Sequence, residues 1–194
     1  MMPIQKLIDH LNTYLPLDAA EIEALHQKTT IRKVKRRQFL LSAGEVCKSY
    51  FFVAEGCFKM YKMDEAAKEH NLLFATENEW ITDIGSLHSD RPSELYIEAI
   101  EPSTVVQLNK SDLIYFYENH LKFNRTFRVI LENQYVELQQ RLLQTISTTA
   151  EERYLKFMSD HPHLINRLPS AQIASYLGIT PEFLSRIRSN RKDF

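Results

Sequence analysis

The chain has 194 residues, of which 44% are hydrophobic and 25% are charged, and its formal net charge is -1. This composition is typical of a globular protein with one large or two small domains, and it excludes a disordered or fibrous chain. No apolar run approaches the roughly 20 residues that span a bilayer. The two cysteines form no C-x-x-C pair, which suits reduced thiols. We therefore expect a cytoplasmic protein with no membrane partner.

The first 28 residues have the apolar spacing of two short helices. Pro16 and Asp18 separate these helices, and Asp18 suits the N-cap of the second one. From residue 30 to about 108 the apolar period falls toward two, in short segments rich in β-branched and aromatic residues. Turn residues, among them Gly44 and Gly56, separate these segments. Many short strands without long helices between them predict an antiparallel sandwich or barrel.

From residue 110 to about 148 the pattern is helical again, with neither Gly nor Pro. An apolar stripe of Phe127, Leu131, Leu138 and Leu142 runs along the second part of this segment. A small β-domain cannot cover so long a helix, and an uncovered stripe would be a large exposed apolar patch. Pairing with a second copy of the chain would bury it, and packing within one chain is the alternative. We expect a homodimer held through residues of about 123–147.

A small helical domain is expected at the C-terminal end. Thr149 and Glu152 match the T-x-x-E pattern of a capping box, so a new helix should begin there. That helix should end before Pro162, which cannot continue it. The predicted boundary between the β-rich part with its long helix and the C-terminal domain therefore lies at residues 148–149.

The stretch SAQIASYLGITPEFLSRIRS, residues 170–189, predicts two helices joined by a tight turn. Gly178 suits the left-handed conformation that ends a helix. Thr180 and Pro181 suit the start of the next helix, and Ala174 is small where the two helices must cross. The second helix is expected to bury three apolar side chains, Phe183, Leu184 and Ile187. Two helices joined in this way form a helix-turn-helix.

The opposite face of the second predicted helix is polar, with residues at i, i+3, i+4 and i+7 that point outward together. An arginine there can bind guanine through two hydrogen bonds, and a glutamate can accept one from the cytosine amino group. Basic residues beside them suit phosphates. The alternative is an unrelated helical hairpin with an exposed arginine. The candidate DNA-binding residues are Thr180, Glu182, Ser185, Arg186, Arg188, Ser189, Arg191 and Lys192.

These features together resemble the Crp/Fnr family of bacterial transcription regulators over nearly the whole chain. The segment IASYLGITPEFLSRIR is similar to the helix-turn-helix of that family, and FLLSAGEVCKSYFFVAEGCFKMY is similar to its β-roll. The β-roll residues that match the pattern are Gly44, Glu45, Phe52 and Gly56. The resemblance implies a β-roll of the cyclic-nucleotide-binding type, a dimerisation helix and a DNA-binding helix-turn-helix. It also implies double-stranded DNA, a second copy of the chain and RNA polymerase as partners.

Within that resemblance, Glu182 and Arg186 occupy the positions of the two residues that read bases in the family. Pro181 stands where many members have a second arginine, so one base contact of the family would be absent here.

The effector pocket departs from the family pattern. Nucleotide-binding members carry Gly-Glu for the ribose and Arg with Ser or Thr for the phosphate. Alignment through the segment YIEAI places Thr82-Asp83 at the first pair and Ser93-Glu94 at the second. A carboxylate repels a phosphate where a cation is required, and Arg91 would replace that cation only after a shift of the loop. The candidate pocket residues are Thr82, Asp83, Gly85, Ser86, Leu87, Arg91, Ser93 and Glu94.

The predicted fold class is therefore α+β, with three parts. Residues 1–121 form an antiparallel β-roll with flanking helices, residues 122–148 a dimerisation helix, and residues 149–194 a helix-turn-helix domain. The predicted function is that of a sequence-specific DNA-binding transcription regulator whose degenerate pocket does not bind cAMP in the usual way. The alternative is a small-molecule-binding regulatory module that acts through protein contacts.

Other classes of function have little support in the sequence. There is no Gly-rich phosphate loop, no H-E-x-x-H motif and no nucleophile elbow, so we do not expect an enzyme. Two cysteines are too few for the four ligands of an iron–sulfur cluster, and we predict no metal site. No cofactor is indicated beyond a small-molecule effector of unknown identity.

Overall fold

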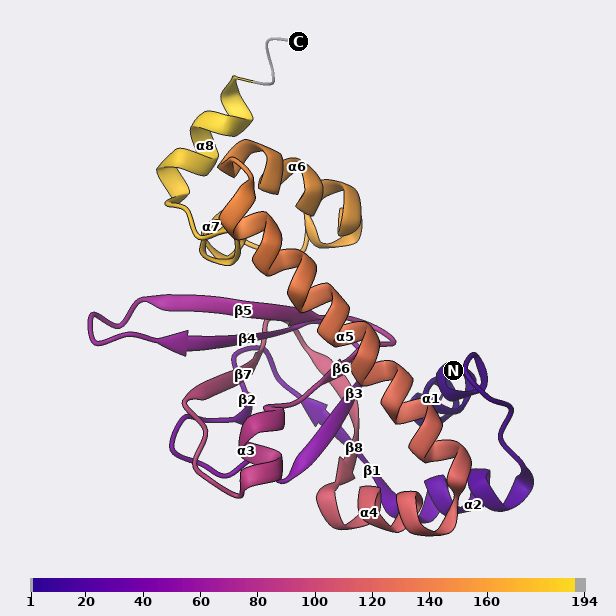
Figure 1. Cartoon of the computed structure of the whole chain (residues 1–194). Helices are drawn as coiled ribbons and strands as arrows, with labels where there is room; N and C mark the ends of the chain where they lie inside the picture. Colours follow the sequence, from indigo (N-terminus) through magenta and orange to yellow (C-terminus); the bar gives the residue numbers. More distant parts are fainter. Residues whose placement is uncertain (1, 191–194) are drawn as a thin grey trace. The chain divides into compact units, whose positions relative to one another are not determined.

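The computed structural model describes residues 2–190. The chain divides into two compact units. The first unit comprises Met1–Lys62 and Leu73–Ile130, and the second comprises Met63–Leu72 and Leu131–Phe194. Figure 1 shows the order of the elements along the chain.

The first unit is built on two antiparallel sheets, which confirms the predicted antiparallel β-domain. Their strand orders are β1–β8–β3–β6 and β2–β7–β4–β5. Although β3 and β4 follow each other directly in the chain, they belong to different sheets. β3 lies between β8 and β6, and β4 lies next to β7. The strands are β1 (Thr29–Val34), β2 (Phe39–Leu41), β3 (Ser49–Glu55), β4 (Phe58–Met63), β5 (Glu69–Ala75), β6 (Trp80–Ile81), β7 (Leu95–Ala99) and β8 (Ser103–Asn109).

Short helices flank these sheets. They are α1 (Pro3–Asn12), α2 (Ala19–Lys28), α3 (Ile84–Ser89) and α4 (Lys110–Asn119). Asp18 caps α2 as predicted, because its carboxylate accepts a hydrogen bond from the Glu21 backbone N–H at 3.0 Å. The Glu21 carboxylate in turn accepts a hydrogen bond from the Asp18 N–H at 2.8 Å, which completes a capping box.

The core of the first unit contains a cluster of aromatic rings. The Trp80 ring lies 5.3 Å from Phe52 and 5.2 Å from Phe127, measured between ring centroids. Phe127 belongs to the long helix α5 (Leu121–Ser147) and is 2% exposed. Its assignment to the pairing stripe is therefore wrong, since its own chain already buries it. The same core also buries Phe123 and Ile130.

The C-terminal part of α5 is different, because its apolar side chains remain exposed within the chain. Leu138 is 53% exposed and Leu142 is 61% exposed, while Leu131 is half-buried. The neighbouring exposed apolar side chains on this part of the helix are Tyr135, Val136, Leu143 and Ile146. The first turns of α5 thus bury apolar side chains in the core of the first unit. Its last four turns carry an apolar face that the chain leaves uncovered.

Three further helices complete the second unit: α6 (Ala150–Asp160), α7 (Ser170–Leu177) and α8 (Pro181–Ser189), with a 3₁₀ turn, η1, at Pro162–Leu164. Thr149 caps α6 in the predicted capping box with Glu152. Figure 1 shows these helices gathered at the C-terminal end of α5. Their shared core includes Tyr154, Phe157 and Ile173.

The second unit also includes the tip of the β4–β5 hairpin, residues 63–72. The Asn71 backbone N–H donates to Ser175 Oγ at 3.0 Å, and the Asn71 side-chain amide donates to Gln172 Oε1 at 2.7 Å. The Arg141 guanidinium donates to the carbonyls of Asn71, Leu72 and Tyr176 and lies 4.0 Å from the Tyr176 ring centroid. These bonds hold the hairpin tip, α5 and α7 together as one compact body.

Candidate nucleic-acid interface and effector pocket

The turn between α7 and α8 has the conformation that the sequence predicts. Gly178 adopts a left-handed φ of 70° and ends α7, a conformation that a side chain with a Cβ adopts at a cost. The Ile179 N–H donates to the Ala174 carbonyl at 3.0 Å, which closes the helix end. Thr180 then caps α8, because its Oγ1 accepts a hydrogen bond from the Phe183 N–H at 3.2 Å. Ala174 is completely buried.

The polar face of α8 is exposed in the described part of the chain. Glu182, Ser185, Arg186 and Ser189 are all exposed, while Leu184 and Ile187 on the opposite face are 0% and 7% exposed. Four side chains capable of polar contacts thus share one uncovered face of α8.

Glu182 is suited to accept hydrogen bonds at this face. A hydrogen bond from its own backbone N–H, and a second from the Thr180 side chain, hold the pKa of Glu182 below its usual range. The carboxylate therefore stays ionised near neutral pH and can accept from an amino group.

One buried position in α8 is predicted wrongly from the sequence. Phe183 is 38% exposed, although Leu184 and Ile187 are buried as expected. The reason is its position: Phe183 follows Glu182 on the helix and precedes Arg186 by three residues, so that it borders the polar face. The guanidinium carbon of Arg186 lies 5.1 Å from the Phe183 ring centroid.

Arg188 is held inside the helical domain, a role that the sequence analysis missed. Its Nε donates to Tyr154 Oη at 2.9 Å, and its Nη1 donates to Ser170 Oγ at 2.7 Å. The guanidinium also lies 5.4 Å from the Tyr154 ring centroid. Arg188 therefore links α8 to α6 and α7 in this structure. Arg191 and Lys192, the other predicted phosphate contacts, lie outside the described residues.

The candidate effector residues lie around α3, in the first unit. Asp83 caps α3, because one of its carboxylate oxygens accepts from the Ser86 N–H at 3.1 Å. Its other oxygen accepts from Ser93 Oγ at 2.6 Å. Both oxygens of the carboxylate that would bind a ribose hydroxyl are therefore already hydrogen-bonded within the protein.

The remaining residues of this candidate pocket are also engaged in local structure. Ser86 Oγ donates to the Arg91 carbonyl at 2.6 Å and accepts from the Cys47 N–H at 2.9 Å. Thr82 Oγ1 donates to the Ser49 carbonyl at 3.0 Å. Leu87 belongs to the core, whereas Gly85 and Arg91 are exposed.

Glu94 does not line the candidate pocket, because its side chain is 77% exposed and forms an ion pair with Lys62. Hydrogen bonding and charge from Lys62 hold the pKa of Glu94 below its usual range. Lys62 is thus paired with Glu94 at the surface and is not presented to a buried phosphate.

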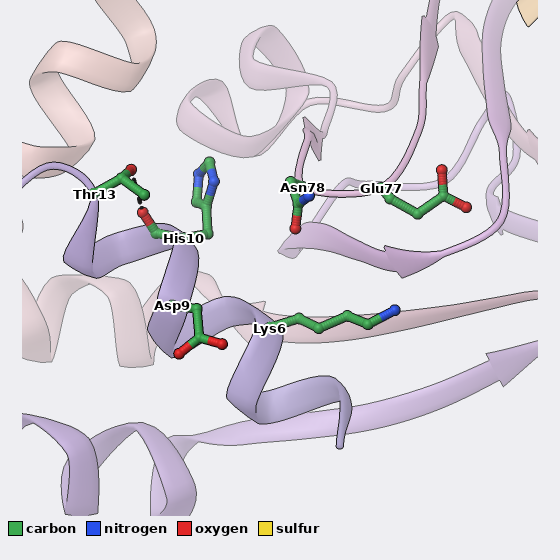
Figure 2. Close-up of a pocket in the computed structure, with 6 residues that line it drawn as sticks. All are labelled: Lys6, Asp9, His10, Thr13, Glu77 and Asn78. Carbon is green, nitrogen blue, oxygen red and sulfur yellow. Dashed lines mark hydrogen bonds between the residues drawn. The ribbon is translucent and has the colours of Figure 1, made fainter. Parts of the chain in front are cut away.

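Two surface hollows occur elsewhere in the first unit. One has a volume of about 540 Å³. The residues that line it, drawn in Figure 2, are Lys6, Asp9, His10, Thr13, Glu77 and Asn78. The other, of about 450 Å³, includes Arg32, Glu45, Cys47 and Gln107. Neither of these two hollows is lined by Asp83 or Ser93.

In the first of these hollows His10 stands between two aromatic rings, with its centroid 5.3 Å from Tyr14 and 5.1 Å from Phe52. Its Nε2 is buried and has no hydrogen-bond partner among the described residues. Burial lowers the pKa of His10 below its ordinary value of 6.5. The ring is therefore neutral at physiological pH and packs as part of the wall between α1 and β3.

Within residues 2–190, no cluster of three or more His, Cys, Asp or Glu side chains has the arrangement of a metal site. Among the helices of the same residues, none is long and apolar enough to cross a membrane.

Comparison with known proteins agrees with the geometry of both units. Residues 31–120 match the family described as cyclic nucleotide-binding domain. This match covers most of β1, the strands β2 to β8, and α4. A search of characterised protein sequences found no match.

Solved structures with the same fold extend over most of the chain. FixK2 from Bradyrhizobium japonicum is 19% identical, with a TM-score of 0.73 over 84% of this chain and 83% of that one. The c-di-GMP-responsive global regulator CLP from Xanthomonas campestris is 13% identical, with a TM-score of 0.74 over 91% and 92%. A protein from Eubacterium rectale described as a transcriptional regulator of the Crp/Fnr family is 14% identical, with a TM-score of 0.71 over 93% of this chain and 88% of that one.

The chain therefore shares the fold of these solved structures, and its residues 31–120 match the cyclic nucleotide-binding domain family. Among these it resembles the Crp/Fnr family, so the resemblance predicted from the sequence, and the α+β fold class with it, are confirmed.

Proposed function

We propose that the chain is a sequence-specific DNA-binding transcription regulator that works as a homodimer. The observation that carries the proposal is the polar face of α8, where Glu182, Ser185, Arg186 and Ser189 are exposed together. The first turn of α8 is capped by Thr180, so these side chains are presented from a rigid helix. A helix of this kind fits the major groove, which displays a different pattern of donors and acceptors for each base pair.

The charges of this face match two bases. The Arg186 guanidinium can donate two hydrogen bonds to the N7 and O6 atoms of guanine. The Glu182 carboxylate, whose pKa is lowered, can accept from the amino group of cytosine. Because Arg188 is bonded to Tyr154 and Ser170, we assign it to holding α8 in place, and not to phosphate contact.

Dimerisation is supported by the uncovered apolar face of α5. Leu138 and Leu142 are more than half exposed and lie on a regular helix that continues to Ser147. A second copy of the same helix could cover them in a symmetric, self-complementary contact. Such a dimer would present two copies of α8 to two half-sites.

The pocket around Asp83 is proposed not to take cAMP in the usual way. Asp83 is bonded to Ser86 and Ser93. A buried phosphate requires a cation and several N–H donors, and Arg91 lies at the surface. The effector, if the protein uses one, would then be a different small molecule.

The test of the proposal is selection of bound fragments from genomic DNA, followed by a binding series over single-base variants of the selected operator at two salt concentrations. Arg186→Ala should weaken binding by roughly 1–3 kcal/mol and flatten the preference at one position in each half-site. Arg36→Ala removes the same charge from an exposed position of the first unit and should leave that preference intact.

If Arg186→Ala lowers the affinity for all variants equally, α8 is not the base-reading helix. If no fragment is selected at all, the chain acts through protein contacts, as the alternative reading of the sequence has it.

A further inference from the structure

The side chain that the polar face of α8 leaves unexplained is Phe183. Its ring is 38% exposed, while the next residue, Leu184, is completely buried. Phe183 is the third residue of α8, in the turn that would meet base edges first if this helix enters the major groove. An aromatic ring cannot form the hydrogen bonds that phosphates or most base atoms require, so a contact between this ring and DNA would be apolar.

The position of the ring relative to Arg186 indicates which base pair the ring would contact. The Arg186 guanidinium carbon lies 5.1 Å from the ring centroid, within the range of a cation–π contact. Phe183 and Arg186 are three residues apart on one helix and therefore neighbours on its surface. If Arg186 reaches a guanine, the Phe183 ring reaches a base pair next to that guanine.

The major groove offers one apolar group for such a ring, the C5-methyl of thymine. We propose that Phe183 is a specificity-determining residue that contacts the methyl group of a thymine beside the guanine bound by Arg186. This inference rests on the proposed function, and it deepens it by naming a second base for each half-site.

Two other roles of Phe183 make different predictions. A ring that only completes the core of the helical domain would affect stability and not base preference. A ring that only orients the Arg186 guanidinium would affect the preference for guanine. A contact with thymine affects the preference for the methyl group alone.

The experiment replaces each thymine of the selected operator by uracil, which removes only the methyl group. For the wild-type protein, the replacement at one thymine of each half-site should lower the affinity for the operator about fourfold. This is the value for burial of one methyl-sized group. This part of the experiment requires no variant of the protein.

The same series is then measured with Phe183→Ala and Phe183→Leu. With Phe183→Ala the thymine and uracil operators should bind equally, while the preference for guanine that depends on Arg186 remains. With Phe183→Leu, which keeps an apolar side chain, part of the thymine preference should remain. The slope of affinity against salt should be the same in all three proteins, because no phosphate contact changes.

The inference is overturned if uracil binds as well as thymine at every position of the wild-type operator, or if Phe183→Ala still distinguishes the two. Loss of the guanine preference in Phe183→Ala, with the thymine preference unchanged, would make Phe183 a positioning residue for Arg186 and also overturn it. Each of these outcomes leaves the proposed function standing, because that function is judged by Arg186→Ala. A chain that selects no operator overturns both.

Discussion

Leu138→Asp places a carboxylate in the middle of the uncovered face of α5, and it should weaken the dimer. Leu138 is 53% exposed in the single chain, so a second copy can still remove about half of its surface from water. Complete burial of a leucine contributes roughly 1.5–3 kcal/mol, and half of that is about 1 kcal/mol for each copy. The two copies together therefore lose about 2 kcal/mol, or roughly 30-fold in the dissociation constant.

This estimate is a lower limit for the substitution. The two-fold symmetry of a helix pair brings equivalent positions near one another, so the two new carboxylates would also repel each other and lose part of their hydration.

The measurement is sedimentation velocity over a wide range of protein concentrations. The matched control is Gln140→Asp, which adds the same charge to an exposed position two residues along α5, on the other side of the helix. Gln140→Asp should dimerise like the wild type, while Leu138→Asp should be monomeric over most of the range. Identical sedimentation of the two variants would refute pairing through this face, as would a wild-type protein that is monomeric throughout.

Three further predictions concern the first unit. Cyclic AMP at millimolar concentration should leave the melting temperature unchanged, since Asp83 is already bonded to Ser93 and Ser86. A ligand at 100 times its dissociation constant would stabilise the protein by about 2.7 kcal/mol. A saturable shift in melting temperature would therefore contradict the proposal that this pocket does not take cAMP in the usual way. Stability against urea should fall as the pH drops below about 6.5, because the unfolded chain binds a proton at His10 that the folded chain, with its lowered pKa, excludes. His10→Asn should reduce this dependence, and an unchanged slope would count against it. Gly56→Ala should destabilise the first unit by roughly 2–5 kcal/mol, because the residue has a φ of +97° and its new Cβ would lie 2.1 Å from Ser103 Oγ. Unfolding would be followed by the fluorescence of Trp80. A variant as stable as the wild type would show that the β3–β4 turn can relax.

The parts of the fold that the sequence predicted well are those that depend on neighbouring residues. The caps at Asp18, Thr149 and Thr180 and the left-handed turn at Gly178 are all present. Each of these is decided by one side chain and the few backbone groups beside it, so the local pattern contains the information that is needed.

The errors arose where burial depends on residues far away in the chain. Phe127 and Leu138 have the same helical pattern, yet the aromatic core covers only Phe127. Arg188 and Arg186 are both basic residues of α8, but Tyr154 and Ser170, from α6 and α7, bind only Arg188. Phe183 lies at the border of the buried face, where a rotation of the helix by a fraction of a turn decides between burial and exposure.

The predicted division at residues 121, 148 and 149 stays a prediction, as do the DNA-contacting residues and the cytoplasmic location. The alignment of Thr82-Asp83 and Ser93-Glu94 with the family pattern did bring Asp83 and Ser93 together, but it gave no sign of the hydrogen bond that joins them at 2.6 Å.

If α8 reads bases as proposed, the small size of its polar face makes dimerisation necessary for the upper range of specificity. In the proposed function one α8 offers two base-reading side chains, Glu182 and Arg186, with Phe183 beside them. Each good contact discriminates by about 1–3 kcal/mol. Specific binding exceeds non-specific binding by about 4–10 kcal/mol in regulators of this kind, so the upper part of that range is reached only when two half-sites, about 34 Å apart, are read together. Leu138→Asp should therefore reduce affinity for the operator far more than affinity for random DNA, whose phosphates a single copy can still contact. Equal losses on both DNAs would mean that one copy of α8 already accounts for the specificity, and that the face of α5 serves another contact.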